Sequence, residues 1–210
     1  MKLTSESKLF LGICISTLAI IGLAVLIFTR PTPVVAIPKE TLVPKDAHTK
    51  GNPDARDYLV EFSDFQCPAC SAFAPTVQKL TDTYKNRLLF AYRHFPLPKH
   101  PYAKTAAYAA EAAGLQGKFW EAEKILFANQ NLFSDEFFST EFAKLVQLDQ
   151  AQFANDMTKE TVKKTVEMDA SAAQLLNLPG TPSFFLNGVL LTNLYGTEDL
   201  VKAVEAAVNK

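Results

Sequence analysis

Apolar and polar positions divide the chain into a short N-terminal part and a longer remainder. The run from Leu9 to Phe28 carries no charge, and at about 1.5 Å per residue it matches a hydrocarbon core of roughly 30 Å. It predicts a transmembrane signal anchor over residues 9–28, after a cytoplasmic tail at residues 1–8. A cleaved signal peptide ending near residues 34–36 is the alternative, but its apolar region is usually only about 7–15 residues long.

This segment sets the expected location of the rest of the chain. An uncleaved anchor with a short leading tail predicts a single-pass protein of the cell membrane whose large domain lies outside the cytoplasm. Residues 29–45 are rich in proline and predict an extended tether. We expect the folded domain to occupy residues 46–210.

Beyond the tether, strand-like and helical patterns follow one another. Residues 58–65 have the apolar and aromatic composition of a buried strand, and residues 71–80 have helical spacing. Residues 87–95 predict a second strand. The segment from about 98 to 177 is helical in pattern and begins with an alanine-rich stretch, so it predicts an all-helical insertion.

The C-terminal pattern is a hairpin followed by a helix. Two apolar runs flank Asn187-Gly188, a dipeptide typical of tight β-hairpin turns. Thr197 is a candidate N-cap for a final helix that ends near Val208. Strand, helix, strand, helical block, hairpin and helix together predict an α/β fold with a central mixed sheet.

Composition and charge exclude some functions. Hydrophobic residues make up 48% of the chain, which includes sixteen Phe, so one domain has ample material for a core. The net charge of −1 gives no basic surface, and we therefore expect no nucleic-acid partner.

Two of the three cysteines carry the candidate chemistry. Cys14 lies inside the apolar run, whereas Cys67 and Cys70 lie where the first predicted strand gives way to a helix. A helix N-terminus stabilises a thiolate through unpaired N–H groups and the helix dipole. Cys67 is therefore the expected nucleophile, and Cys70, one turn further on, would resolve the mixed disulfide.

Other uses of this cysteine pair fit the sequence less well. A closed zinc site takes four ligands, and the histidines His48, His94 and His100 lack paired spacing. A structural disulfide across two residues closes too short a loop to restrain the unfolded chain much. We expect no metal and no cofactor apart from a redox-active Cys67–Cys70 disulfide.

Several motifs around this pair belong together. They are Gly51-Asn52-Pro53-Asp54-Ala55, the run Glu61-Phe62-Ser63-Asp64-Phe65-Gln66-Cys67-Pro68-Ala69-Cys70, Arg93-His94-Phe95-Pro96-Leu97, and Gly180-Thr181-Pro182. With these motifs, residues 45–208 closely resemble the DsbA-like disulfide oxidoreductases of the thioredoxin fold, including membrane-anchored bacterial members. The resemblance implies a thioredoxin-like fold with an inserted helical subdomain.

The resemblance also assigns residues that meet the substrate. It implies that the Thr181-Pro182 peptide is cis, lies beside the cysteines and pairs with an extended substrate segment. Pro68 and Ala69, between the cysteines, complete the expected substrate-binding set. Without the resemblance, the ordinary expectation for Pro182 is a trans proline that opens a strand.

A further implied residue is Glu61, six positions before Cys67, where the family has a buried acid that relays a proton as Cys70 becomes a thiolate. An acid on a strand is otherwise usually a solvated surface residue. Pro68 and Ala69 offer no side-chain hydrogen bond, whereas the strong oxidant of the family has a histidine between its cysteines. We therefore expect a lowered pKa for Cys67 but a less oxidising pair.

The leading functional hypothesis is an extracytoplasmic thiol:disulfide oxidoreductase that donates disulfides to exported proteins with cysteines. A membrane redox partner would reoxidise the pair, or reduce it if the reaction runs the other way. The alternatives are a disulfide reductase or isomerase, a peptide-holding chaperone and a metal-binding module.

Overall fold

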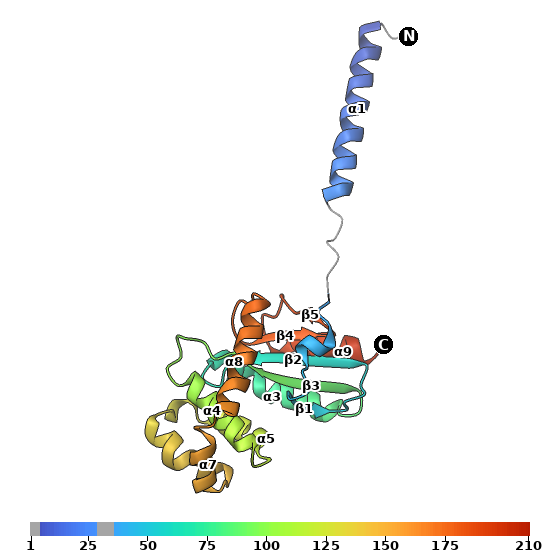
Figure 1. The fold of residues 1–210 in the computed structure, drawn as a ribbon. Coiled ribbons are helices and arrows are strands. Elements are labelled where there is room, and N and C mark those ends of the chain that lie inside the picture. The colour runs from blue at the N-terminus through green and yellow to red at the C-terminus, as the bar shows by residue number, and fades with distance from the viewer. Residues whose placement is uncertain (1–4, 29–35) are drawn as a thin grey trace. The chain divides into compact units, whose positions relative to one another are not determined.

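Figure 1 shows the computed structural model, which describes residues 5–28 and 36–210. Contacts divide the chain into two units, Met1–Val35 and Ala36–Lys210, and each is described by itself. Residues 1–4 of the predicted tail lie outside the described residues. So do residues 29–35 of the predicted tether, including Val34 and Val35 of the alternative cleavage site.

The first unit holds one described helix, α1 (Ser5–Phe28). Within the part of the chain that the structure describes, no helix is both long and apolar enough to cross a membrane. This finding corrects the prediction of a single-pass membrane anchor and of a location at the cell membrane.

The second unit is built on a five-stranded mixed sheet in the order β1-β3-β2-β4-β5. The central strands β2 and β3 run parallel, and the β1–β3, β2–β4 and β4–β5 pairs are antiparallel. The strands are β1 (His48–Gly51), β2 (Asp57–Ser63), β3 (Leu88–His94), β4 (Ser183–Leu186) and β5 (Val189–Leu190). The sequence predicted β2, β3 and the hairpin but not the four-residue β1, whose partner β3 is distant along the chain.

Helices cover both faces of this sheet. Along a strand, side chains alternate between the two faces, so Leu59 and Phe90 join one core while Val60 and Ala91 join the other. The first core is closed by α3 (Pro68–Thr83), α5 (Phe119–Ala128) and α9 (Thr197–Val208), and the second by α2 (Lys39–Leu42) and α8 (Glu160–Leu175). Buried Leu42 packs the end of the predicted tether onto the domain.

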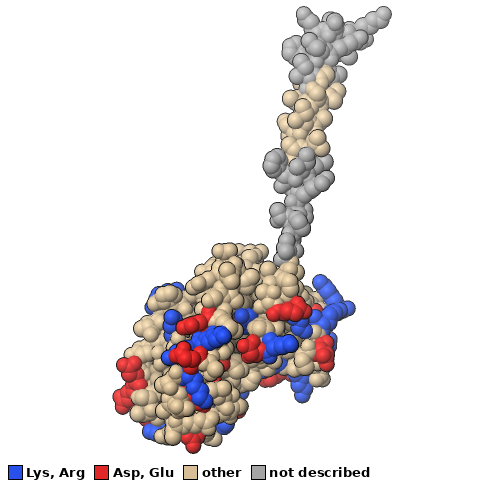
Figure 2. All heavy atoms as spheres, in the orientation of Figure 1, with Lys and Arg blue, Asp and Glu red and all other residues tan. Residues whose placement is uncertain are grey.

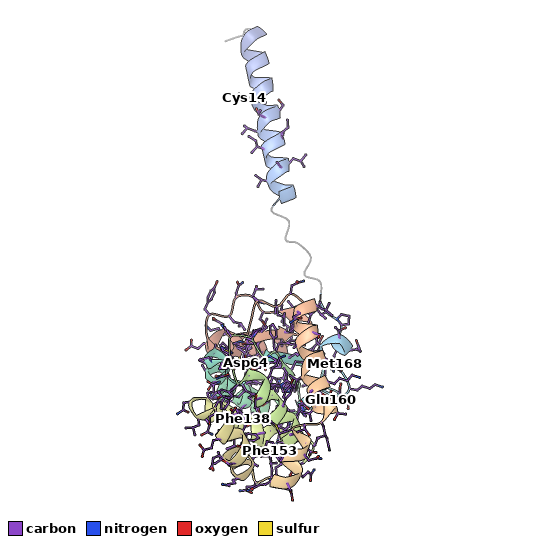
Figure 3. All side chains as sticks on the ribbon, turned by 60° about the vertical axis from the view of Figure 1, so that its left-hand side comes forward. Cys14, Asp64, Phe138, Phe153, Glu160 and Met168 are labelled. Atoms are coloured by element: carbon purple, nitrogen blue, oxygen red, sulfur yellow. The ribbon has the colours of Figure 1, made fainter. Side chains whose placement is uncertain are left out.

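Between β3 and β4 the chain is helical, as predicted. Before α8 it forms α4 (Ala103–Gly114), α5, the 3-10 turn η1 (Gln130–Leu132), the π-helical turn η2 (Phe137–Glu141), α6 (Phe142–Val146) and α7 (Gln150–Asp156). Buried phenylalanine rings hold this block together, among them Phe138 and Phe153 (Figure 3). The predicted thioredoxin-like fold with an inserted helical subdomain is confirmed.

The C-terminal elements match the sequence pattern with one correction. Asn187 and Gly188 have φ angles of 51° and 84°, the left-handed conformation of a tight hairpin turn. Gly196, not Thr197, is the N-cap of α9, and its extended backbone offers no side-chain cap. Instead the Asp199 carboxylate accepts a hydrogen bond from the Tyr195 N–H at 3.0 Å.

Charges on the second unit are mixed. Figure 2 shows basic and acidic side chains interspersed on the visible face, without a stripe of either sign.

Candidate active site

The turn between β2 and α3 places the two cysteines. Cys67 is the N-cap of α3, with an extended backbone, and Pro68 occupies the first turn, where a missing N–H is tolerated. Cys67 is 6% exposed and Cys70 is fully buried, whereas Pro68 and Ala69 are exposed beside them. One sulfur therefore lies near the surface and the other lies behind it.

The buried carboxylate of Asp64 holds this turn in place (Figure 3). One oxygen accepts a hydrogen bond from the Gln66 N–H at 2.8 Å. The other accepts from the Leu97 N–H at 2.8 Å and from His100 Nδ1 at 2.7 Å. The turn is thus tied to the segment that follows β3.

Gln130 of η1 ties the same turn to the helical block. Its Nε2 donates to the carbonyl oxygens of Phe65 at 2.8 Å and of Cys67 at 3.0 Å. The sequence pattern assigned no role to Gln130, or to Asp64 within the motif before Cys67. No local pattern identifies Gln130, because its two acceptors lie more than sixty residues earlier in the chain.

The loop before β4 closes the site from the other side. The Thr181-Pro182 peptide is cis, as the resemblance implied. Cys67 Sγ lies 3.4 Å from the carbonyl oxygen of Thr181, which accepts a hydrogen bond from it when the sulfur is protonated. The predicted Cys67, Cys70, Thr181 and Pro182 therefore lie together, although Thr181 is 114 residues from Cys67.

This environment lowers the pKa of Cys67 to about 5. The hydrogen bond from Cys70 contributes most, and partial burial opposes it. The side chain of Thr181 and the backbone N–H groups of Ala69 and Cys70 further favour the thiolate. Cys67 is therefore largely ionised at neutral pH, as a nucleophile needs to be.

Cys70 behaves in the opposite way. Burial raises its pKa far above the ordinary value, and the hydrogen bond to Cys67 and the nearby Glu61 raise it further. A Cys70 thiolate formed here would therefore take up a proton readily.

Glu61, in the middle of β2, is 2% exposed. Burial raises the pKa of its carboxyl to about 8, against the hydrogen bond that the Ser63 hydroxyl donates at 2.7 Å. The buried acid that the resemblance implied is thus present and holds a proton at neutral pH. Ser63 could have been found from the sequence, because residues two apart on a strand share a face.

A metal site would need several ligating side chains close together. Among the residues that the structure describes, no three or more His, Cys, Asp or Glu side chains form a group able to hold a metal ion. The site thus brings together the two sulfurs, the thiolate-stabilising groups around Cys67 and the protonated Glu61.

Comparison with known proteins agrees with this geometry. A family model described as Thioredoxin matches residues 44–206. The chain belongs to the thioredoxin family. A solved thioredoxin-like oxidoreductase from Silicibacter pomeroyi DSS-3 is 30% identical, with a TM-score of 0.68, over 83% of this chain and 99% of that one. The thiol-disulfide exchange protein alpha-DsbA2 from Wolbachia pipientis is 19% identical, with a TM-score of 0.72, over 80% and 91%.

Membership of the thioredoxin family confirms the predicted family and fold, and the solved oxidoreductases named above share that fold.

Curated relatives carry a different name. The chain is 36% identical over 181 residues to the Na(+)/H(+) antiporter NhaA 1 of Mycolicibacterium gilvum. That match covers 84% of this chain but 29% of the antiporter. The chain thus spans less than a third of the length of this relative, and the name of the whole relative assigns no transport activity to it.

Proposed function

We propose that this protein donates disulfides to exported proteins that carry cysteines. The observation that carries the proposal is the pairing of a Cys67 pKa of about 5 with a buried, proton-accepting Cys70. A low pKa makes Cys67 a good leaving group and stabilises the reduced pair, and both effects favour transfer of the disulfide to a substrate.

The reaction takes two exchanges. A substrate thiolate attacks Cys67 Sγ, the Cys67–Cys70 bond breaks, and Cys70 leaves with the electron pair and takes the proton of Glu61. A second substrate thiolate then attacks the substrate sulfur of the mixed disulfide, and Cys67 leaves as a thiolate. The substrate gains a disulfide, and the cysteine pair gains two electrons.

The exposure of the residues around Cys67 supports the proposal that they bind the substrate. Thr181 and Pro182 are partly exposed next to Cys67, and exposed Pro68 and Ala69 border the same sulfur. An extended substrate segment that pairs with this backbone would bring its own sulfur to Cys67. We propose no cofactor beyond the redox disulfide, and a membrane redox partner that reoxidises it.

A peptide with two cysteines tests the activity. We expect the oxidised full-length protein to convert the reduced peptide to its disulfide, measured by mass spectrometry, and Cys67→Ser to abolish the conversion. Reduced Cys70→Ser mixed with oxidised peptide should accumulate a mixed disulfide. Cys14→Ser is the matched control and keeps the wild-type rate; peptide oxidation by Cys67→Ser at that rate would refute the proposal.

The reduction potential tests the direction. Equilibration with glutathione mixtures should give a potential above about −200 mV if the protein donates disulfides, whereas a value near about −270 mV is that of a reductant such as thioredoxin. The thiol state in cells gives a second test, since a resting dithiol would favour the reductase alternative.

A further inference from the structure

Strand register places a row of polar side chains on the sheet face that α3 and α5 cover. Glu61 of β2 pairs with Tyr92 of β3, and Lys50 of β1 pairs with Phe90 of β3. Paired residues share a face, and so do Phe90 and Tyr92, which are two apart. Glu61, Tyr92 and Lys50 therefore lie in sequence across one face of three neighbouring strands.

Glu123 of α5 meets the far end of this row. Its carboxylate lies 3.1 Å from Lys50 Nζ, and the residue is 8% exposed. Lys50 also lies over the ring of Trp120, 4.0 Å from its centroid. A second buried acid is thus fixed above the sheet by packing and by an ion pair.

Tyr92 pairs with Glu61 on the neighbouring strand and is buried. Its hydroxyl has no hydrogen-bond partner among the described residues, and ordered water usually fills such a position. Burial and the charges of Glu61, Cys70 and Glu123 raise the pKa of Tyr92, against the nearby Ser63 hydroxyl, which lowers it. Both acids are therefore close to this side chain.

Solvent reaches the row at Glu123. A cavity of about 260 Å³ between α3 and α5 is lined by Lys50, Glu123, Ser71 and Pro75, among others. One water takes about 30 Å³ of liquid volume, so several waters fit there. The cavity lies on the α5 side of the cysteine-bearing helix and does not include Cys67 among its lining residues.

We propose that Glu123 is the proton path of Glu61: protons pass between Glu61 and the water of this cavity by way of Glu123, with water at the Tyr92 hydroxyl linking the two acids. This inference rests on the proposed function. When Cys70 leaves as a thiolate it takes the Glu61 proton, and the resulting Glu61 carboxylate regains a proton from solvent through Glu123. No electrons move in this second step.

The groups that face Glu123 suit a relay. Lys50 and His48 from β1 and Lys124 from α5 stabilise its charge, whereas burial opposes it and raises its pKa. Glu61 and Tyr92 face it from β2 and β3. An acid whose pKa is raised above the ordinary value takes up a proton more readily than an exposed glutamate and can pass it on.

The test compares Glu123→Gln with Glu121→Gln, an exposed acid on the same helix. Oxidised full-length protein is reduced with dithiothreitol between pH 6 and 9, and free thiols are trapped by alkylation. We expect Glu123→Gln to lower the rate about tenfold and to flatten its pH profile, with the Cys67 thiolate absorbance titration unchanged. Glu121→Gln should match the wild type, and Glu123→Asp should recover part of the rate.

Tyr92→Phe is the second test variant, for the case in which Glu123→Gln folds poorly. It retains the ring and removes a hydroxyl that has no partner among the described residues. It should slow reduction in the same direction. Wild-type rates and pH profiles for either folded variant would overturn the proton path while the wild type still exchanges disulfides. Failure of the wild type to react would overturn the proposed function itself, and the proton path with it.

Discussion

Two buried glutamates on neighbouring parts of the same core have pKa values shifted in opposite directions. Burial raises the pKa of Glu61 beneath the cysteines to about 8. Burial also disfavours the charge of Glu111 on α4, but hydrogen bonds from His48 and His94 outweigh it and lower the pKa to about 2. His48 Nε2 and His94 Nε2 lie 2.9 Å and 2.7 Å from the same oxygen of Glu111.

The difference shows that burial alone does not decide whether an acid is charged. Glu111 has two imidazole partners and is a permanent anion that links β1, β3 and α4. Glu61 has the Ser63 hydroxyl as its donor and keeps its proton at neutral pH. The number and charge of the donors separate a structural carboxylate from a reactive one.

Removing the Glu61 carboxyl should have the largest effect on how the free energy of unfolding depends on pH. A folded pKa near 8 against about 4.5 in the unfolded chain means that the folded state binds the proton more tightly, so stability falls as pH rises from about 4.5 to about 8. Glu61→Gln should remove this loss of about 4 kcal/mol. Urea unfolding of the reduced protein at pH 4.5 and pH 8 measures it, and exposed Glu136→Gln is the control; equal pH dependence in wild type and Glu61→Gln would contradict a raised pKa.

Glu111→Gln should have a smaller effect of opposite sign. The lowered pKa of Glu111 stabilises the fold above about pH 4.5, and this contribution is lost as pH falls toward about 2. We expect Glu111→Gln to cost about 3 kcal/mol at neutral pH, because it removes the charge that both imidazoles face. Urea unfolding at pH 7 tests this, and a variant as stable as the wild type would remove the distinction between the two acids.

Ser63→Ala should sharpen the comparison from the Glu61 side. Without the hydroxyl donor at 2.7 Å, the pKa of Glu61 should rise by about one further unit. Carbon-13 NMR titration of the glutamate carboxyls measures the shift. Exposed Ser139→Ala serves as the control, and a fall in the Glu61 pKa in Ser63→Ala would show that another donor takes over.

The smallest effect is expected for His48→Phe. Phenylalanine preserves the ring stacked on Phe119 at 3.4 Å but removes one of the two donors to Glu111. The pKa of Glu111 should rise by about one unit, with a loss of about 1 kcal/mol at neutral pH. The same NMR titration checks it, and an unchanged Glu111 pKa would mean that His94 alone holds the anion.

Local patterns predicted most of the fold. The strands at residues 58–65 and 87–95 and the Asn187-Gly188 turn follow from side-chain alternation and turn chemistry, which act over a few residues. β1 and the packing of buried Leu42 escaped prediction because their partners are distant in the sequence. The membrane-anchor prediction was made from the length of one apolar run. It was wrong, because no described helix is long and apolar enough to cross a membrane.

The candidate site divides in the same way. The spacing of Cys67 and Cys70 at a helix start was visible in the sequence, and the family motifs pointed to Glu61, Thr181 and Pro182. Asp64 and Gln130 were not found, because each holds the turn through contacts with segments that only folding brings near.

The sequence by itself determined the cysteine pair, its position at the start of α3 and the α/β order of the elements, since all three depend on neighbours along the chain. Only the tertiary structure decided the acidities. The proton on Glu61, the charge on Glu111 and the thiolate at Cys67 depend on burial and on donors from distant elements, and these are properties of the packed core.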